Sequence, residues 1–312
     1  MIRATIVVPR LLAASEPEGD EEEPTRSGSR GGVVSGKQGG ERRAKRRPAG
    51  PRHLFSAWED VAFRLCTAKR VALLLDFDGT LVNLQARPGE VRFGQPGRRV
   101  LARLARHPRV VVVIVSGRAL ADIRRRVGVR GVRYFGLFGW EHDGATAPAN
   151  LLAKRRIEKA KMAVRAAIRD FPGIWIEDKG LSCVVHFRSA RRATIHQARN
   201  TVRRVLRPFR SGLRLLSGKK TWEILPSMIR GKGAAVSALL ARLPQSTLPI
   251  YAGDDVADES AFWALRRGIT VHVGKSRHTR ARFRLRNPKE VLQFLRKLED
   301  QLLCARPSHF TS

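Results

Sequence analysis

The chain has 312 residues, of which 43% are hydrophobic, so it is long enough to bury one or two ordinary cores. The 61 Lys and Arg residues against 27 Asp and Glu give a formal net charge of +34, and aromatic residues make up only 6%. The basic residues are dispersed and not interleaved with aromatics, which favours a coding bias and argues against a nucleic-acid partner.

The cysteines and the N-terminus indicate the compartment. Cys66, Cys183 and Cys304 are far apart and form no CxxC pair, so neither a zinc knuckle nor a disulfide framework is indicated. The N-terminal MIRATIVVPRLLAAS is interrupted by Pro9 and Arg10 before a secretion-signal core develops. No apolar stretch is long enough to span a bilayer. We therefore expect a cytoplasmic protein without a membrane partner.

The first part of the chain is predicted to be disordered. Residues 15–52 are mainly Gly, Ser, Pro, Glu and Arg with few apolar residues. Such a segment cannot bury enough apolar surface to offset the loss of chain entropy on folding. We assign residues 1–52 to a low-complexity tail.

The next part alternates apolar strands with helices. After an amphipathic stretch at 58–65, the pattern predicts strand 71–75, helix 97–106, strand 110–115, helix 119–127 and a strand at 134–138. Fully apolar strands separated by helices are typical of a parallel sheet that is covered on both faces.

The middle of the chain has a different order of elements. It predicts helix 151–170, strands 174–177 and 182–187, helix 191–207, and strands 213–216 and 221–225. A helix followed by two strands, repeated once, indicates a separate antiparallel α+β unit.

The alternation of helices and strands resumes at Lys232. It predicts a helix to 243, strand 248–252, a helix through 262, strand 269–273 and a last helix from Pro288, a favourable first-turn residue. The sequence thus predicts an α/β fold. Its doubly wound, Rossmann-like parallel-sheet core comprises residues 53–145 and 226–312, and an α+β cap is inserted at 146–225.

Four polar segments lie at points where predicted strands end or helices begin. They are DFDGT (76–80), SGR (116–118), GKG (231–233) and GDD (253–255). A strand end followed by Asp-Gly is often only a turn. Reactive groups, however, gather where the strands of an open parallel sheet end, and four such segments in one chain indicate a site.

These segments resemble the motifs of the haloacid dehalogenase superfamily of aspartate-nucleophile phosphatases. The DxDGT motif is met by Asp76 to Thr80, the strand-ending Ser by Ser116, the lysine by Lys232 and the acidic pair by Asp254 and Asp255.

A narrower resemblance covers roughly residues 71–282. SGR, EDKG (177–180), HFR (186–188), GKKTWEILP (218–226) and GDDVADESAF (253–262) are similar to trehalose-6-phosphate phosphatases. The chain departs from that family at Ala257, where Thr is usual, and at FGWE (138–141), where His-Gly-x-Glu is usual.

The resemblance implies a phosphatase of the haloacid dehalogenase fold. Asp76 would attack phosphorus and become an aspartyl phosphate, and Asp78 would act as general acid and then as general base. Ser116 and Lys232 would hold the phosphate. Mg²⁺ would be bound by the side chains of Asp76 and Asp254 and the backbone carbonyl of Asp78.

The remaining candidates surround this centre. Thr80, Gly117 and Arg118 would contact the substrate, whereas Asp255 and Asp258 would support the site from behind. By resemblance, the cap residues Glu177, Lys179 and Glu223 hold the sugar hydroxyls, a task that suits charged hydrogen-bonding side chains. Charges at strand edges also discourage edge pairing, which is their simpler explanation.

The expected function is Mg²⁺-dependent hydrolysis of trehalose 6-phosphate, a small-molecule sugar phosphate. A cation is needed because each unit-charge pair between carboxylate and phosphate costs about 4 kcal/mol at about 4 Å and a dielectric of about 20. The alternatives are a phosphatase for another sugar phosphate, or a basic nucleic-acid-binding protein on a vestigial phosphatase scaffold. The intact acids and Lys232 argue against the latter, because a binding module has no use for buried acids.

Overall fold

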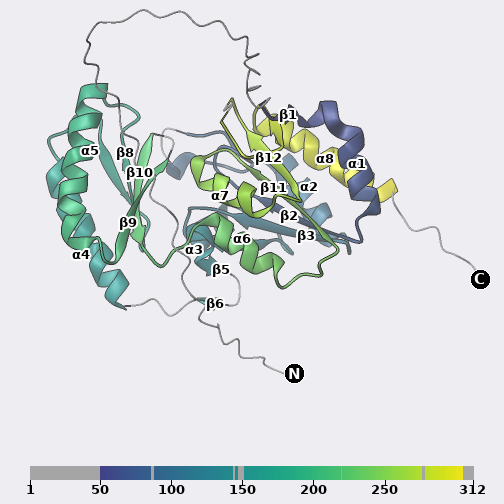
Figure 1. The fold of residues 1–312 in the computed structure, drawn as a ribbon, viewed down its shortest axis with the longest axis horizontal. Coiled ribbons are helices and arrows are strands. Elements are labelled where there is room, and N and C mark those ends of the chain that lie inside the picture. Colours follow the sequence, from purple (N-terminus) through teal and green to yellow (C-terminus); the bar gives the residue numbers. More distant parts are fainter. Residues whose placement is uncertain are drawn as a thin grey trace, which may run out of the picture. The chain divides into compact units, whose positions relative to one another are not determined.

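The computed structural model describes residues 50–85, 88–142, 145–146, 151–218, 220–275 and 278–304, so most of the predicted tail lies outside the described residues. These residues fall within one compact unit that spans Pro48–Ser312. The helices are α1 (Trp58–Thr67), α2 (Gln95–Arg106), α3 (Leu120–Val127), α4 (Leu151–Ile168), α5 (Arg192–Leu206), α6 (Lys232–Leu240), α7 (Val256–Ala264) and α8 (Pro288–Cys304) (Figure 1). The strands are β1 (Arg52–His53), β2 (Arg70–Leu75), β3 (Val110–Val115), β4 (Arg133–Gly136), β5 (Glu141–His142), β6 (Ala145–Thr146), β7 (Trp175–Asp178), β8 (Cys183–His186), β9 (Leu213–Gly218), β10 (Thr221–Pro226), β11 (Thr247–Gly253), β12 (Ile269–Val273) and β13 (Phe283–Leu285).

The larger sheet is mostly parallel. Its order is β1-β13-β12-β11-β2-β3-β4-β5-β6, and the pairs from β1 through β4 are parallel, whereas β5 and β6 are antiparallel to their neighbours. The chain runs outward from β2 to β4 on one side and later from β11 to β13 on the other. β2 therefore lies where the strand order reverses, which is the usual ligand position in such sheets.

Helices cover both faces of this sheet. Leu73 and Leu75 of β2 pack in one buried cluster with residues of α1, α2, α3 and α8. Leu74 faces the opposite way, into a second cluster with residues of α6 and α7. All three leucines are fully buried, and each contributes about 1.5–3 kcal/mol to the stability of the fold. The strand that ends at Asp76 is thus anchored on both faces, and the predicted α/β class is confirmed.

The cap is built on a separate antiparallel sheet. Its order is β7-β8-β10-β9, and α4 and α5 pack on one side of it (Figure 1). Cys183 and Val185 of β8 and Trp222 and Ile224 of β10 pack with apolar residues of the two helices. Because successive side chains of a strand point to opposite faces, Glu223 of β10 faces away from the helices.

One predicted strand ends earlier than expected. The strand predicted to reach residue 138 ends at Gly136, and the next two residues, Leu137 and Phe138, have φ values of 44° and 58°. Phe138 packs with Leu225 and Ile229 and so leaves the line of the sheet. Packing against Leu225 of β10 and Ile229 just after it overrides the apolar strand pattern.

Four short strands toward the two edges of the larger sheet, β1, β13, β5 and β6, had not been predicted. β1 pairs with β13, through Arg52 to Phe283 and His53 to Arg284. Two and three residues are too few to give a periodic signal, although the buried–exposed–buried pattern of β13 is that of a strand. Arg52, assigned to the tail, is therefore the first residue of a strand.

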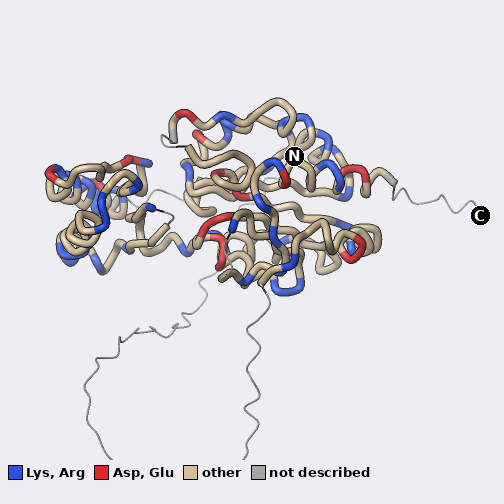
Figure 2. The backbone as a smooth tube through the Cα atoms, turned by 90° about the horizontal axis from the view of Figure 1, so that it is seen from above, with Lys and Arg blue, Asp and Glu red and all other residues tan. Residues whose placement is uncertain are grey.

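The structure also shows where the basic residues lie and how apolar the helices are. Lys and Arg occur along helices of both the larger sheet and the cap, as the sequence indicates (Figure 2). Among the described residues, no helix combines the length and apolar character needed to cross a membrane.

Candidate active site

The sheet brings the polar segments together at its carboxyl edge. Leu75, the last residue of β2, has Ile114 of β3 and Ala252 of β11 as Cα partners. Each of these strands then runs directly into a polar segment, which begins with Asp76, Ser116 or Asp254. Residues that are far apart in the chain therefore meet beside the end of β2.

Asp76 is buried and both of its carboxylate oxygens accept hydrogen bonds. Lys232 Nζ donates to Oδ1 at 2.6 Å and Thr80 Oγ1 donates to Oδ2 at 3.1 Å. The backbone N–H of Asp76 donates to the carbonyl of Ala252 at 2.9 Å, which extends the sheet by one residue. The residue is 4% exposed, so the orientation of its side chain is set by these contacts and not by solvent.

Asp258 orients Lys232 from the far side. Its Oδ1 accepts from Lys232 Nζ and from Tyr251 Oη, both at 2.7 Å. Its Oδ2 accepts from the backbone N–H groups of Asp254 and Asp255, at 3.0 and 2.9 Å. Asp255 is the N-cap of α7 and forms a capping box with Asp258. One carboxylate thus fixes both the lysine and the acidic loop.

Three carboxylates converge at this point. Oxygens of Asp76, Asp254 and Asp258 all lie within 4.8 Å of one another, and one ammonium, that of Lys232, contacts two of them. Burial raises the pKa of Asp76 well above its ordinary value; Lys232 opposes this effect, whereas Asp258 and Asp254 add to it. Burial disfavours the charge of Lys232, but Asp258 and Asp76 outweigh it and raise the pKa of Lys232.

The donor set fits a hard divalent cation. Carboxylate oxygens with this spacing suit Mg²⁺, and a cation would keep Asp76 ionised against the repulsion of its neighbours. The four hydrogen bonds of Asp258 already engage both of its oxygens. Asp76 and Asp254 line the active-site cavity whereas Asp258 does not, so these two are the better side-chain ligands of the three.

The turn after β2 requires a glycine. Gly79 has φ +84°, and a Cβ at this position would lie 2.1 Å from Oδ2 of Asp254. The backbone of the DFDGT segment therefore passes directly against the acidic loop. A side chain here would displace the Asp254 carboxylate.

Asp78 is held by Arg118 on the other side of the site. Arg118 Nε and Nη2 donate to the two oxygens of Asp78 at 2.6 and 2.7 Å, and Nη1 donates to Asp122 at 2.9 Å. Asp122 also accepts from Arg126 at 2.8 Å. Such bidentate pairs are geometrically specific, so the orientation of Asp78 depends on a chain of contacts that reaches into α3.

Ser116 and Gly117 complete the edge beside β3. Ser116 is 1% exposed, and its Oγ accepts from the backbone N–H of Arg118 at 3.1 Å. A Cβ at Gly117 would lie 2.9 Å from Cζ of Phe138, so this position admits only a glycine without a shift of that ring. Both residues lie next to the first carboxylate motif, as predicted from their place at a strand end.

The cap presents a second group of charges. Lys179 Nζ lies 3.6 Å from Oε1 of Glu223, which also accepts from Ser182 Oγ at 2.9 Å. Burial raises the pKa of Glu223, and the Lys179 ammonium opposes this shift. Glu177 contacts His186 Nε2 at 2.8 Å. Burial disfavours the charge of Glu177, but His186 and Lys179 outweigh it and lower its pKa.

One cavity joins the two groups. It has a volume of about 210 Å³, and the candidate site residues that line it are Asp76, Asp78, Gly117, Arg118, Glu177, Lys179, Glu223, Lys232, Asp254 and Asp255. Thr80, Ser116 and Asp258 do not line it but contact residues that do. Ala257 and Phe138, where the chain departs from the family pattern, also line the cavity.

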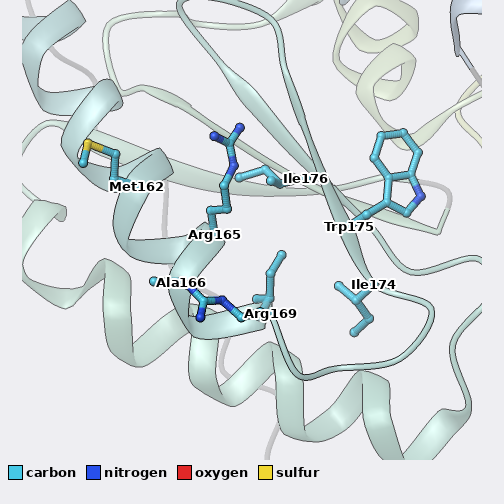
Figure 3. Close-up of a pocket in the computed structure, with 8 residues that line it drawn as sticks. Met162, Arg165, Ala166, Arg169, Ile174, Trp175 and Ile176 are labelled. Atoms are coloured by element: carbon cyan, nitrogen blue, oxygen red, sulfur yellow. The ribbon is translucent and has the colours of Figure 1, made fainter.

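A larger cavity lies on the cap but lacks comparable chemistry. It has a volume of about 580 Å³ and lies between α4 and the start of β7 (Figure 3). The residues that line it are Met162, Arg165, Ala166, Ile168, Arg169, Ile174, Trp175 and Ile176. This set contains no carboxylate, hydroxyl or thiol, so the smaller cavity is the candidate active site.

Sequence reasoning missed several residues of the site. Tyr251, Asp122 and Ser182 each hold one of the charged side chains. Tyr251 occupies an apolar strand, where an aromatic residue resembles ordinary core. Asp122 lies four residues after Arg118, a spacing that could have indicated a helical ion pair.

Comparison with known proteins identifies the family to which the chain belongs. The model of the trehalose-phosphatase family matches residues 74–289, which is more than half of the chain. The chain belongs to the trehalose-phosphatase family. The match includes every candidate site residue named above, from Asp76 to Asp258.

Relatives that are 31–35% identical include two trehalose-phosphate phosphatases and one protein with a different name. A trehalose-phosphate phosphatase of Mycobacterium leprae is 33% identical over 260 residues, which cover 76% of this chain and 59% of that protein. One of Mycolicibacterium paratuberculosis is 31% identical over 285 residues, 84% of this chain and 69% of that protein. An uncharacterized glycosyl hydrolase of Mycobacterium tuberculosis is 35% identical over 254 residues, 75% of this chain but 19% of that protein. The chain thus spans less than two thirds of several of its relatives.

Solved structures share the fold. The C-terminal domain of C. albicans trehalose-6-phosphate phosphatase matches with a TM-score of 0.70 and 22% identity, covering 81% of this chain and 99% of that domain. A trehalose-6-phosphate phosphatase related protein matches with a TM-score of 0.63 and 24% identity, covering 75% and 100%. At these identities, the likeness establishes the haloacid dehalogenase-like fold.

Proposed function

We propose that the protein hydrolyses trehalose 6-phosphate to trehalose and inorganic phosphate. The observation that carries the proposal is a single cavity lined by the carboxylate–lysine group at the end of β2 and by charged residues of the cap. A phosphate-cleaving group on one wall and hydrogen-bonding groups on the other suit a substrate that joins a phosphate to a sugar. Membership of the trehalose-phosphatase family supports the choice of sugar.

Asp76 is the proposed nucleophile. One of its carboxylate oxygens attacks phosphorus, the bond from phosphorus to the sugar oxygen breaks, and an aspartyl phosphate forms. Water then attacks this intermediate, which releases phosphate and restores the carboxylate. Lys232 contacts Asp76 at 2.6 Å, so its positive charge offsets the repulsion between this carboxylate and the incoming phosphate, and it stabilises the carboxylate that the second step restores.

Asp78 is the proposed acid and base. It donates a proton to the leaving sugar oxygen and later accepts one from the attacking water. Both of its oxygens accept hydrogen bonds from Arg118 in this structure. To donate a proton, Asp78 must therefore release at least one of these contacts, and arrival of the substrate provides the competing hydrogen-bond partner.

Mg²⁺ is the proposed cofactor. The side chains of Asp76 and Asp254 and the backbone carbonyl of Asp78 would hold it, because hard oxygen ligands are arranged around a buried excess of negative charge. When bound, the ion supplies charge neutralisation between the nucleophile and the phosphate. Thr80 would orient the Asp76 carboxylate, and Ser116 and Gly117 would help to position the phosphate oxygens.

Sugar recognition is assigned to the cap. Glu177, Lys179 and Glu223 line the cavity opposite the carboxylates, and each can exchange charged hydrogen bonds with sugar hydroxyls. Lys179 Nζ and Glu223 Oε1 are 3.6 Å apart, farther than in a short hydrogen bond, so the two groups can each bond a sugar hydroxyl placed beside them. A cytoplasmic location accords with the free thiols of Cys66 and Cys183.

The test is phosphate release from a panel of sugar phosphates. With Mg²⁺, the purified protein should act on trehalose 6-phosphate with a kcat/KM at least about tenfold above that for glucose 6-phosphate. Excess EDTA should abolish the activity, and added Mg²⁺ should restore it. If the protein prefers another sugar phosphate, that compound replaces trehalose 6-phosphate as the proposed substrate. If it releases phosphate from none of the sugar phosphates, the proposal is overturned.

A further inference from the structure

Lys161 is a buried charged residue that lies outside the candidate active site. It belongs to α4 of the cap, is 3% exposed and does not line the active-site cavity. Ile157 and Val164, four residues before and three after it on the same face of α4, pack in the apolar core of the cap. An ammonium group in such surroundings is costly unless it is fully hydrogen-bonded.

The contacts of Lys161 point to one turn. Its Nζ donates to Oδ1 of Asp178 at 2.7 Å and to the carbonyl oxygen of Gly180 at 3.2 Å. A third bond, at 2.6 Å, goes to Glu158 one turn earlier on α4. Burial disfavours the charge, but Asp178 and Glu158 outweigh it and raise the pKa of Lys161. The residue is therefore a charged clamp on the end of β7.

The clamped turn carries two of the proposed sugar-binding residues. Glu177 and Lys179 line the cavity, whereas Asp178 between them does not. Since neighbouring side chains along β7 point to opposite faces, holding Asp178 on the α4 side directs its neighbours to the cavity side. Figure 3 shows α4 and β7 side by side, with Ile176 of β7 toward Arg165 of α4.

The turn is tightened further by its own hydrogen bonds. The backbone N–H of Gly180 donates to the same Oδ1 of Asp178 at 2.7 Å, and the N–H of Lys179 donates to the carbonyl oxygen of Ser182 at 2.9 Å. Gly180 has φ +79°, a conformation that other residues rarely adopt. Asp178 is thus the shared acceptor through which Lys161 reaches the turn.

We propose that Lys161 is a positioning residue for leaving-group recognition: it holds the Asp178–Gly180 turn and so aims Glu177 and Lys179 at the sugar. The inference rests on the proposed function for the identity of the sugar. It goes beyond that function in assigning specificity to a residue that does not touch the substrate.

The first test is Lys161→Met in the full chain. Glu158 and Asp178 are each almost half exposed, so water can solvate them when the ammonium is lost, and the cap should still fold. We expect kcat/KM for trehalose 6-phosphate to fall about tenfold, mainly through KM, while that for p-nitrophenyl phosphate stays within about twofold. Lys159→Met, at an exposed position of the same helix, is the control and should change neither.

A double-mutant cycle tests the route. Asp178→Ala should lower kcat/KM for the sugar phosphate at least as much, because it removes the acceptor of both Lys161 and the Gly180 N–H, and adding Lys161→Met to it should cause no further loss, because the contact between the two side chains is already absent. Lys161→Arg, which keeps the charge, should recover most of the activity on the sugar phosphate. Additive losses in the double variant, or equal losses on both substrates, would overturn the positioning role.

Amide hydrogen exchange separates this inference from the proposed function. In Lys161→Met, the Gly180 amide should exchange at least about threefold faster than in the wild type, whatever sugar the enzyme prefers. Unchanged exchange overturns the inference even if trehalose 6-phosphate is the substrate. If the wild type does not hydrolyse trehalose 6-phosphate but the Gly180 amide exchanges faster in Lys161→Met, the proposed substrate is wrong and the role of Lys161 in holding the turn is supported.

Discussion

At the scale of single residues, several carboxylates of the site share a small number of positively charged side chains. Asp76 accepts one bond from Lys232 and one from Thr80, and Asp258 accepts four bonds in all. These two acids are adjacent in space and differ in task. Both oxygens of Asp258 are engaged in hydrogen bonds that hold other groups. Asp76 also lines the cavity, so its carboxylate can meet the phosphate of a substrate.

The nucleophile can be tested by Asp76→Asn. The amide is nearly isosteric and Lys232 keeps Asp258 as its partner, so the melting temperature should stay within about 3 °C or rise, since one buried like charge is removed. Phosphate release should fall at least about a thousandfold, because an amide is a poor nucleophile toward phosphorus. Initial rates and thermal melts measure both quantities.

A matched substitution guards against a trivial loss. Asp60→Asn changes an exposed aspartate of α1 that pairs with Arg52, and it should leave turnover unchanged. Full phosphate release by Asp76→Asn would transfer the nucleophile to another group.

At the scale of elements, the cap sheet has two faces with different tasks. Its apolar side chains, such as Val185 and Ile224, pack against α4 and α5. Its charged ones, such as Glu177 and Glu223, face the cavity. The period of two along a strand produces both faces from consecutive residues, so the cap carries a core and a recognition surface on one sheet.

The recognition surface can be tested by Lys179→Ala and Glu223→Ala. Each should lower kcat/KM for trehalose 6-phosphate at least about tenfold, because losing a charged hydrogen bond costs about 1.5–3 kcal/mol. Hydrolysis of p-nitrophenyl phosphate should scarcely change, since its small leaving group does not need the cap. Steady-state kinetics on both substrates measure the split.

The pattern of losses separates the explanations. Equal losses on both substrates, with a lower melting temperature, would mean that the Lys179–Glu223 pair only stabilises the cap. No loss on either would mean that both are ordinary strand charges. Lys154→Ala, at an exposed position of α4, controls for the loss of a positive charge.

At the scale of the whole molecule, residues 48–312 form a compact unit that contains every candidate site residue. The sheet order places β11, β2 and β3 next to each other although more than 130 residues separate β3 from β11 in the chain. The cap is inserted in the chain between β6 and α6, and its residues Glu177, Lys179 and Glu223 line the same cavity as Asp76.

Deletion of residues 1–49 should therefore have little effect. Residues 15–49 have few apolar residues, and the compact unit that begins at Pro48 has its own core. We expect kcat/KM within about twofold of the full chain and a melting temperature within about 2 °C. A fall of many degrees on removal would show that the N-terminal residues contribute to the core.

The sequence by itself determined the fold class and the carboxylate motifs. Buried strands such as 71–75 and 110–115 are continuous apolar runs, and the short spacing of Asp76, Asp78 and Thr80 is a local property of one strand end. Such features depend on residues that are neighbours along the chain, so the order of residues in the sequence is sufficient to predict them.

Only the tertiary structure decided which side chains meet. That Asp258 holds Lys232, that Arg118 grips Asp78 and that Lys161 clamps the turn at Asp178 are contacts between elements. The early end of β4 has the same origin, since Phe138 turns away to pack with Leu225. Packing free energy between distant segments sets these choices, and periodicity along the chain carries no information about it.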